Sequence, residues 1–402
     1  MKNFILIFFL FILSEEIEQY FSDIFLDSET FSISIYIEDT KTFNAIADLE
    51  SEFSYIDDNT LPLTSLTSAS KLNEKLTFKI DNKESTGIEV KDNANINKNS
   101  LKINDFSFII YPSSFSKLKS ISFGYKYRKN HNLIYLLKKS NLIKKAQFTI
   151  EINNNSKGKI YYGEISNDIL NPYKYTLNIP VKSNNKNWDF ELQFLFIGEI
   201  SYKYENTYYY NQNKASFSGN SKGILAPEMA FDFIVDNVFN ESITKNVCRK
   251  TIAENNEIEC ICDKLKEENL KHITFVIKDK SIIFNTKEYF DIIGNRCVFQ
   301  IKYNNVKREE WKFGISFLSK FLSTFDYEKG QIILRTKEKN FEEVDVNTLF
   351  PLKKMIIWTL VIVIILLIPF MYKIIKESIK KHRERRINAF IKENYTQLEP
   401  IK

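Results

Sequence analysis

The 402-residue sequence is poor in glycine and in histidine. The first shortage bears on the backbone conformation, and the second on which catalytic mechanisms are available. Glycine accounts for 10 residues, well below the usual share of about 7%. Each glycine is therefore expected to mark a backbone position that tolerates little else. His131 and His272 are the only histidines before residue 350. Because a serine or cysteine protease triad needs a His as its base, such a triad is not expected here. A short repeat of the solenoid kind is also missing.

Positive charge is concentrated at the C-terminal end of the chain. Residues 373–402 contain nine Lys or Arg and four Asp or Glu, which accounts for the whole net charge of +5. Because the remaining chain is formally neutral, the basic patch of a folded nucleic-acid-binding domain is not expected. The abundant aromatic residues, 34 Phe and 21 Tyr, favour strands over helices.

Two apolar runs predict how the chain meets a membrane. The run from Phe4 to Leu13 follows one Lys and ends in polar residues; it is too short to span a bilayer and predicts a signal peptide over residues 1–14. A second run, Met355 to Tyr372, is uncharged and predicts one transmembrane helix over residues 353–372. The basic segment 373–402 follows at once, which places it in the cytosol. We therefore expect a single-pass type I membrane protein of the secretory pathway or cell surface.

This topology would expose two glycosylation sequons to the lumen or the cell exterior. They begin at Asn154 and Asn240. A third sequon begins at Asn394 and would lie unused in the cytosol.

The portion between the two apolar runs shows mainly strand patterns. Apolar and polar residues alternate over Phe31–Ile37, Leu76–Ile80, Phe148–Ile152 and Phe190–Ile197, as they do in half-buried strands. Helix patterns are few: one covers Asn132–Lys145, and a second follows Ala226-Pro227, where Pro suits a first helical turn. The fold class is therefore mostly β with a few surface helices.

All four cysteines lie within one stretch of 50 residues: Cys248, Cys260, Cys262 and Cys297. An even count in an oxidising compartment predicts two disulfides. We expect Cys297 to pair with Cys260 or Cys262, and Cys248 to take the other. The alternative is a zinc site, but the stretch lacks Cys-x-x-Cys spacing and holds His272 as its one histidine. We expect no metal and no other cofactor.

The segment from Trp311 to Ile332 resembles the last segment of pepsin-like aspartic proteases. It contains an apolar-apolar-Gly strand ending at Gly314, a short helix, a Phe-Asp strand and a turn at Gly330. Weaker similarities, in the family's order, extend the resemblance to about residues 30–337. The resemblance implies two similar β lobes, 15–170 and 171–350, which form a bilobal pepsin-like acid-protease fold.

In that family each lobe contributes one Asp, within an Asp-Thr-Gly motif, to a cleft between the lobes. The two carboxylates share one proton because like charges at that range cannot both ionise. The resemblance places Asp48 at the first aspartate position, with Ser51 matching the family, but Leu49 and Glu50 replace Thr and Gly. Glu50 lies two residues from Asp48 and could point to the same side.

The second motif departs further from the family. Ser218 stands at the second aspartate position and Asn220 replaces Gly, while Ser221 follows at the next motif position. In the first lobe, Leu76–Gly87 fits the flap hairpin, where Ile80 occupies the family's Tyr position. The resemblance thereby implies that Ile80, Ser51 and Ser221 line a substrate-binding cleft.

Three functions remain open at this point. A hydroxyl at Ser218 cannot share a proton with Asp48 at neutral or acidic pH, so we expect an inactive, membrane-anchored homologue that binds a protein or peptide between its lobes. The alternative is an active aspartic endopeptidase that uses Asp48 with a non-standard second acid. A surface protein that keeps only the fold is the third possibility.

Overall fold

The structure is a computed structural model, and it describes residues 19–26, 30–37, 41–62, 70–80, 83–96, 101–112, 119–124, 131–153, 157–182, 187–202, 213–251, 257–266, 268–304, 309–343 and 351–395. The predicted signal peptide and the Asn154 sequon lie outside these residues. The chain divides into two compact units, Met1–Glu343 and Val344–Lys402.

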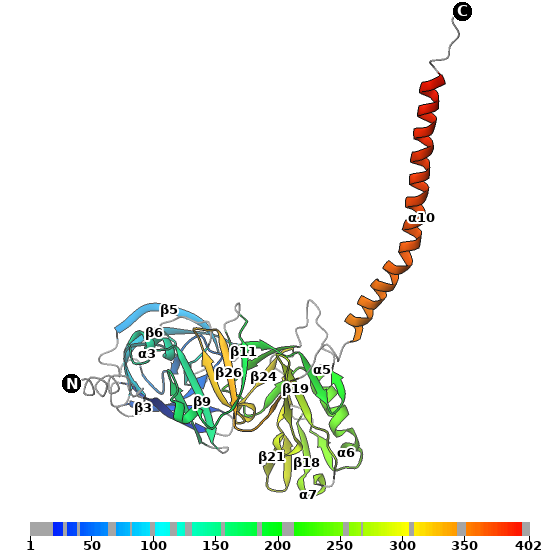
Figure 1. The fold of residues 1–402 in the computed structure, drawn as a ribbon. Helices are drawn as coiled ribbons and strands as arrows, with labels where there is room; N and C mark the ends of the chain where they lie inside the picture. The colour runs from blue at the N-terminus through cyan, green and yellow to red at the C-terminus, as the bar shows by residue number, and fades with distance from the viewer. Residues whose placement is uncertain are drawn as a thin grey trace, which may run out of the picture. The chain divides into compact units, whose positions relative to one another are not determined.

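The first unit is mostly β, as the sequence predicts (Figure 1). Its largest sheet has 13 strands, in the spatial order β11 (Tyr175–Pro180), β26 (Gln331–Thr336), β25 (Leu322–Asp326), β9 (Gln147–Asn153), β10 (Lys157–Tyr162), β1 (Tyr20–Leu26), β2 (Phe31–Ile37), β3 (Lys41–Asp48), β8 (Ser120–Ser122), β4 (Tyr55–Asp57), β7 (Leu101–Tyr111), β6 (Lys83–Ile96) and β5 (Ser70–Ile80).

Three smaller sheets belong to the second half of this unit. The first has the order β12 (Asp189–Glu191), β15 (Lys214–Phe217), β24 (Trp311–Phe313), β16 (Ile224–Ala226) and β23 (Ile301–Tyr303). The second has the order β14 (Ile200–Tyr202), β13 (Phe194–Ile197), β19 (Ile273–Ile277), β20 (Lys280–Phe284) and β27 (Phe341–Glu343). The third has the order β17 (Cys248–Lys250), β18 (Ile258–Ile261), β22 (Arg296–Phe299) and β21 (Phe290–Ile293).

The large sheet joins the two halves of the unit. Strand β25 pairs antiparallel with β9, so that Phe325 lies opposite Phe148, although the two are far apart in the sequence. Figure 1 shows β26 and β9 in the same region of the molecule. The Phe148 and Phe325 rings stack with centroids 4.7 Å apart, and the Trp188 ring meets Phe325 edge-on at 5.0 Å. Apolar burial and aromatic contacts of this kind hold the halves together.

The same strand pattern occurs once in each half. In the first half, β3 pairs parallel with β8, β8 antiparallel with β4, and β4 parallel with β7. In the second half, β15, β24, β16 and β23 repeat these three pairings in the same order. Strands β3 and β15 lead into the two loops that the sequence analysis singles out. The repeat therefore places Asp48 and Ser218 at corresponding positions.

The short helices lie between strands. They are α3 (Leu133–Lys139), α4 (Asn167–Leu170), α5 (Glu228–Ile234), a π-helical turn η3 (Val235–Phe239), α6 (Asn240–Thr244), α7 (Cys262–Leu265), a 3-10 turn η4 (Thr286–Glu288) and α8 (Ile315–Leu318). The helix predicted after Pro227 is confirmed as α5. The helix predicted over Asn132–Lys145 begins as expected, with Asn132 capping it, but it ends at Lys139. Asn141 follows with a φ of 57°, a left-handed conformation that cannot continue the helix.

The strand predicted over Phe190–Ile197 is wrong as a single element. It is divided between β12 and β13, which belong to different sheets. At the break, the Leu192 N–H donates to the Asn213 carbonyl, and the Gln193 N–H donates to the Val276 carbonyl, both at 2.8 Å. These long-range partners take the chain from one sheet to the next, which alternation alone does not reveal.

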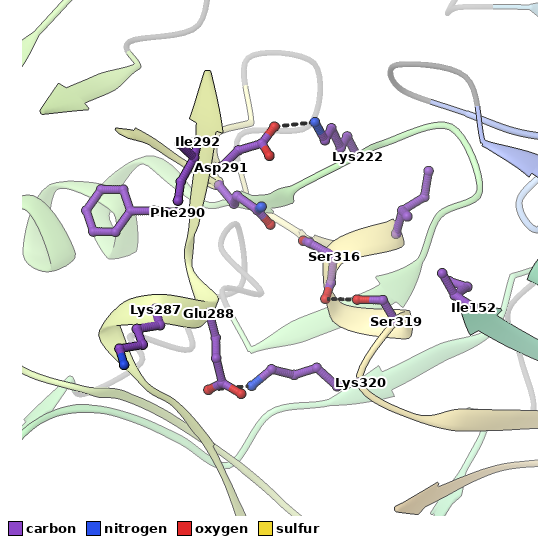
Figure 2. Close-up of a pocket in the computed structure, with 12 residues that line it drawn as sticks. Ile152, Lys222, Lys287, Glu288, Phe290, Asp291, Ile292, Ser316, Ser319 and Lys320 are labelled. Carbon is purple, nitrogen blue, oxygen red and sulfur yellow. Dashed lines mark hydrogen bonds and ion pairs between the residues drawn. The ribbon is translucent and has the colours of Figure 1, made fainter. Parts of the chain in front are cut away.

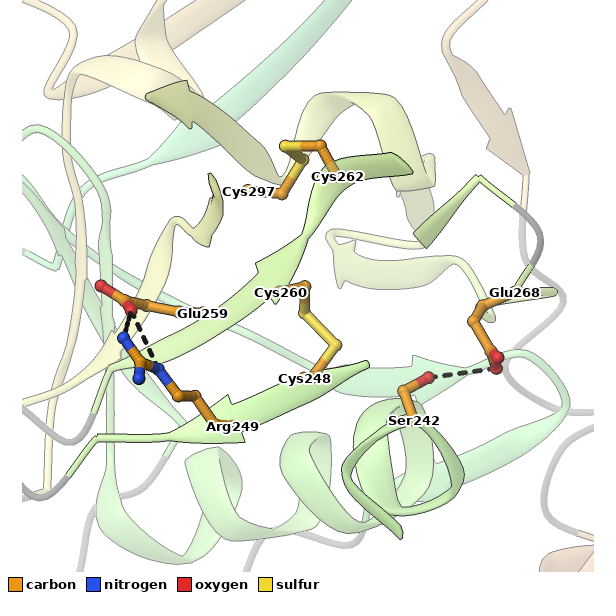
Figure 3. The surroundings of a disulfide bond; sticks show 8 residues. All are labelled: Ser242, Cys248, Arg249, Glu259, Cys260, Cys262, Glu268 and Cys297. Atoms are coloured by element: carbon orange, nitrogen blue, oxygen red, sulfur yellow. Dashed lines mark hydrogen bonds and ion pairs between the residues drawn. A yellow bond between two sulfur atoms is a disulfide. The ribbon is translucent and has the colours of Figure 1, made fainter. Parts of the chain in front are cut away.

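The four cysteines form two disulfides, Cys248–Cys260 and Cys262–Cys297. Cys260 lies opposite Cys248 on one side and opposite Cys297 on the other, so either pairing left open by the sequence was compatible with the strand order. Figure 3 shows that Cys248–Cys260 bridges β17 and β18, and that Cys262–Cys297 joins the start of α7 to β22. All four thiols are consumed, which rules out the zinc alternative at these residues.

The second unit contains α10 (Pro351–Tyr395). Within the described residues, Thr359–Phe390 is the one helical segment whose length and apolar composition suit a membrane crossing. The helix continues past the predicted span over 353–372 into the basic segment as far as Tyr395, and it contains Pro369. This candidate span and the two disulfides fit a membrane protein of the secretory pathway.

Candidate functional site in the two repeated loops

Asp48 is the last residue of β3, where the chain leaves the sheet and turns back around the side chain. Its Oδ1 accepts hydrogen bonds from the Glu50 N–H at 2.8 Å and the Ser51 N–H at 3.1 Å. The Ser120 hydroxyl donates to Oδ2 at 3.4 Å. The carboxyl is buried, with 5% of the residue exposed. The loop thus holds one carboxyl in a fixed orientation.

The pKa of the Asp48 carboxyl is raised above its ordinary value. Burial is the main cause, because desolvation penalises the charged form, and the nearby Glu50 carboxylate adds to it. Hydrogen bonds from the Glu50 and Ser51 N–H groups and from the Asn220 side chain act in the opposite direction without reversing the shift. Asp48 therefore holds its proton more strongly than an exposed Asp does.

Ser218 begins the corresponding loop after β15. Its N–H donates to the Phe313 carbonyl at 3.0 Å, and its Oγ accepts the Asn220 N–H at 3.2 Å. The hydroxyl therefore takes the place that Asp48 Oδ1 takes in the first loop, as an acceptor for the N–H two residues later. Ser218 is also buried. The turn survives without a carboxylate because a hydroxyl oxygen can accept the same bond.

The second loop contacts β2 and β3 of the first half through its backbone. The Phe31 N–H donates to the Gly219 carbonyl at 3.1 Å. A Cβ added to Gly219 would lie 2.3 Å from the Ala47 carbonyl oxygen, so this close approach requires glycine. The residue that reaches Asp48 from the second half is Asn220, through its side chain. In the sequence, Asn220 is visible only as the replacement of a family glycine.

Glu50 lies at the centre of a contact that sequence reasoning missed. Its Oε2 accepts a hydrogen bond from the Lys312 ammonium at 2.7 Å, and its Oε1 lies 3.5 Å from the Ser216 hydroxyl. Both side chains of the ion pair are largely buried, with 20% of Glu50 and 14% of Lys312 exposed. The contact joins the first loop to β24 and β15 of the second half. Two features of the sequence pointed to this contact: a Glu at a position where the family has Gly, and a Lys two residues before Gly314.

The predicted cleft-lining residues have the following places. The Ser51 hydroxyl donates to the Phe53 carbonyl at 2.6 Å, and the Ser221 hydroxyl donates to the Gly223 carbonyl at 3.1 Å. Both serines therefore brace their own loops. Ile80 ends β5 opposite Lys83, within the hairpin of β5 and β6 that the sequence predicts. Asn240, which begins one of the two sequons predicted to face the lumen or cell exterior, is exposed at the start of α6.

No group of three or more His, Cys, Asp or Glu side chains suited to a metal ion occurs among the residues that the structure describes. Around Asp48, the hydrogen-bond donors are backbone amides, a hydroxyl and the Asn220 side chain. The acid that raises its pKa, Glu50, comes from the same loop. A proton shared between acids of the two halves is therefore not part of the described geometry.

The strand pattern is repeated in the two halves of the first unit, and in each half it leads into a loop around a buried polar side chain. This arrangement defines a pepsin-like protein. The family model for eukaryotic aspartyl protease matches residues 59–336. Because the match spans more than half of the chain, the protein belongs to the eukaryotic aspartyl protease family. The matched range begins after Asp48 and includes Ser218. No curated protein sequence matches the chain significantly.

Proposed function

We propose that this protein is a membrane-anchored, catalytically inactive member of the family that binds polypeptide in the cleft between its lobes. The single observation that carries the proposal is the hydrogen bond between Ser218 Oγ and the Asn220 N–H. It puts a hydroxyl where the family's chemistry needs a second carboxyl. A hydroxyl does not ionise in the range in which an aspartic dyad works, so it cannot share the proton of Asp48.

Glu50 is the nearest candidate for a substitute acid. Its carboxylate is instead paired with the Lys312 ammonium, and it belongs to the same loop as Asp48, whereas the family's chemistry needs an acid from the opposite half. This disfavours the alternative, an active endopeptidase that uses Asp48 with a non-standard acid. The same ion pair ties the first loop to β24 of the second half without any requirement for catalysis.

Polypeptide binding is supported by the β5–β6 hairpin, which lies where the family has its flap. The β5–β6 hairpin is long and paired up to Ile80, and a hairpin edge can hold an extended peptide through backbone hydrogen bonds. The basic segment after the apolar part of α10 supports a cytosolic C-terminus. A cleaved signal peptide would then place the first unit in the lumen or outside the cell.

The test of inactivity uses the full-length protein in detergent micelles with a casein-like substrate between about pH 3 and 7, the range of a shared-proton dyad. We expect no cleavage that a pepstatin-type transition-state mimic inhibits, and no change with Asp48→Ala. Pepstatin-sensitive cleavage that disappears in Asp48→Ala would instead establish the endopeptidase.

A matched gain-of-function variant checks the chemical reason. Ser218→Asp combined with Glu50→Gly and Asn220→Gly restores two carboxyls and removes the competing groups. Acid-dependent cleavage is expected in this variant and not in the same background with Ser218→Asn. For binding, Ile80→Asp should release captured peptides from the cleft, since it places a charge on the hairpin that would cover them.

A further inference from the structure

A pocket of about 460 Å³ lies mainly among elements of the second half, and Ile152 of β9, from the first half, also lines it (Figure 2). Its lining includes neither Asp48 nor Ser218. Strand β21 forms one wall, and α8 with the residues after it forms the other. We call it the β21 pocket. Its volume falls within the range of about 300–1,000 Å³ that is usual for ligand sites.

The pocket runs along the free edge of β21. Among the described residues β21 is the last strand of its sheet and pairs only with β22. Phe290, Asp291 and Ile292 all line the pocket. Consecutive side chains of a strand point to opposite faces, so a pocket lined by three in a row borders the strand's edge. Ile292 is 71% exposed there.

The hydrogen-bond ladder shows which backbone groups this edge presents. The Gln300 N–H donates to the Tyr289 carbonyl at 2.8 Å, which makes the next pair, Phe290 with Phe299, a non-hydrogen-bonded pair. Two residues on, Ile292 and Cys297 have the same relation. The N–H and C=O groups of Phe290 and Ile292 therefore point away from β22, toward the outer edge.

Ion pairs at the two ends of the pocket leave little charge for a ligand. Lys222 pairs with Asp291, and Lys320 pairs with Glu288 at 2.8 Å; Figure 2 shows them at opposite ends. The pKa of Lys320 is lowered, mainly by burial, while its contact with Glu288 acts the other way. Both acids and two of the three lysines are already paired, and the third, Lys287, is exposed to solvent. An uncharged ligand therefore fits the interior better than an ionic one.

Two polar atoms in the pocket walls lack partners. Gln300 Oε1 and Ser316 Oγ are buried and accept or donate no hydrogen bond among the described residues. An unsatisfied buried polar atom costs about 1–3 kcal/mol. A bound segment that brought an amide donor to them, after rotation of either side chain, would remove this cost.

We propose that the β21 pocket binds an extended, uncharged segment of another polypeptide, which adds as a strand to the free edge of β21. Strand addition satisfies the outward groups of Phe290 and Ile292 and covers the exposed Ile292 side chain. Because β21 has four residues, the bound segment is about four residues long. The proposal is independent of the interlobe cleft.

The first experiment varies the peptide and measures its affinity for the unaltered protein. Full-length protein in detergent micelles is screened against terminally blocked hexapeptides in which aliphatic and uncharged polar residues alternate, and hits are titrated by fluorescence anisotropy. Each hit is then N-methylated at one residue at a time. Strand addition predicts a loss of at least about tenfold at every second residue, and little at the residues between. A methylation profile without this alternation, or no hit at all, overturns the proposal.

The second experiment removes one outward donor. Ile292→Pro deletes the Ile292 N–H, which the β22 ladder does not use, whereas Ile292→Ala keeps it and shortens the side chain. Edge strands tolerate Pro at such positions. Hits should lose at least about tenfold in Ile292→Pro beyond the loss in Ile292→Ala, since outward backbone bonds carry the binding. Equal affinity for the two variants contradicts strand addition. Hits that weaken instead with Ile80→Asp report the interlobe cleft and count against this pocket.

Discussion

The Glu50 carboxylate of the first loop accepts a hydrogen bond from the Lys312 ammonium of the second half at 2.7 Å. In the family's motif this position is a glycine. A charged Glu side chain therefore occupies a position where the family has no side chain, and the Lys312 ammonium of the second half pairs with its charge. In the proposed inactive protein, a fixed ion pair thus lies next to the position where the family's chemistry needs two carboxyls to share a proton.

This ion pair should contribute to stability through a measurable coupling. Both side chains are mostly buried, so Lys312→Met leaves the Glu50 charge without its partner and should cost about 1–3 kcal/mol. The double variant with Glu50→Gln should cost less than the sum of the single variants. Chemical denaturation of the four proteins in a double-mutant cycle should give a coupling of about 1 kcal/mol. Additive effects would show that the pair does not form in solution.

Asp48 should make stability depend on pH in a defined direction. Its folded-state pKa is raised above the ordinary value of 3.8, so the folded state keeps a proton that the unfolded state has lost. The free energy of unfolding therefore falls as pH rises from the unfolded pKa through the folded pKa. Asp48→Asn keeps an acceptor for the Glu50 and Ser51 N–H groups and removes this titration. Thermal melting should show stabilisation at pH 7 and none at pH 3; the opposite order would contradict the raised pKa.

Gly219 should be intolerant of a side chain because the second loop approaches the backbone of β3 there. The Cβ of Gly219→Ala would meet the Ala47 carbonyl oxygen at 2.3 Å, and neither backbone can rotate out of the way. We expect a loss of about 2–3 kcal/mol in chemical denaturation. Gly294→Ala is the matched control, since that Cβ meets nothing within 4 Å and only the φ of 63° opposes it; its cost should be about 1 kcal/mol. Equal losses would argue against the close approach.

The two disulfides should differ in how much they stabilise the fold. They close loops with sequence separations of 12 for Cys248–Cys260 and 35 for Cys262–Cys297. In the chain-entropy model these loops are worth about 3 and about 4 kcal/mol. Replacing each pair by Ser and measuring denaturant midpoints should therefore show the larger loss for Cys262 and Cys297. Peptide mapping without reduction checks the pairing, and a Cys260–Cys297 peptide would contradict it.

The type I orientation can be read from glycans. Asn240 is exposed at the start of α6, and in the proposed topology it enters the lumen, whereas Asn394 stays in the cytosol. Expression in a secretory-pathway host should give a gel shift on endoglycosidase treatment. Asn240→Gln should reduce that shift and Asn394→Gln should leave it unchanged. A shift that depends on Asn394 would reverse the orientation.

Much of this protein could be predicted from local patterns, because strands and helices leave a periodic record in neighbouring residues. Strand β2 occupies the whole predicted range Phe31–Ile37, and α5 follows Pro227 as expected. The apolar run near the C-terminus predicts the membrane-compatible helix. The family resemblance also located both loops, although it could not say what Asn220 does there.

What the sequence by itself determined is therefore the elements, their class, the family and the positions of the two motifs. Only the tertiary structure decided which cysteine pairs with Cys297, where the chain breaks between β12 and β13, and which cation meets Glu50. The physical reason is the distance along the chain. Local patterns record a residue's burial and its immediate neighbours, whereas these contacts join residues up to 262 positions apart, and only packing brings them together.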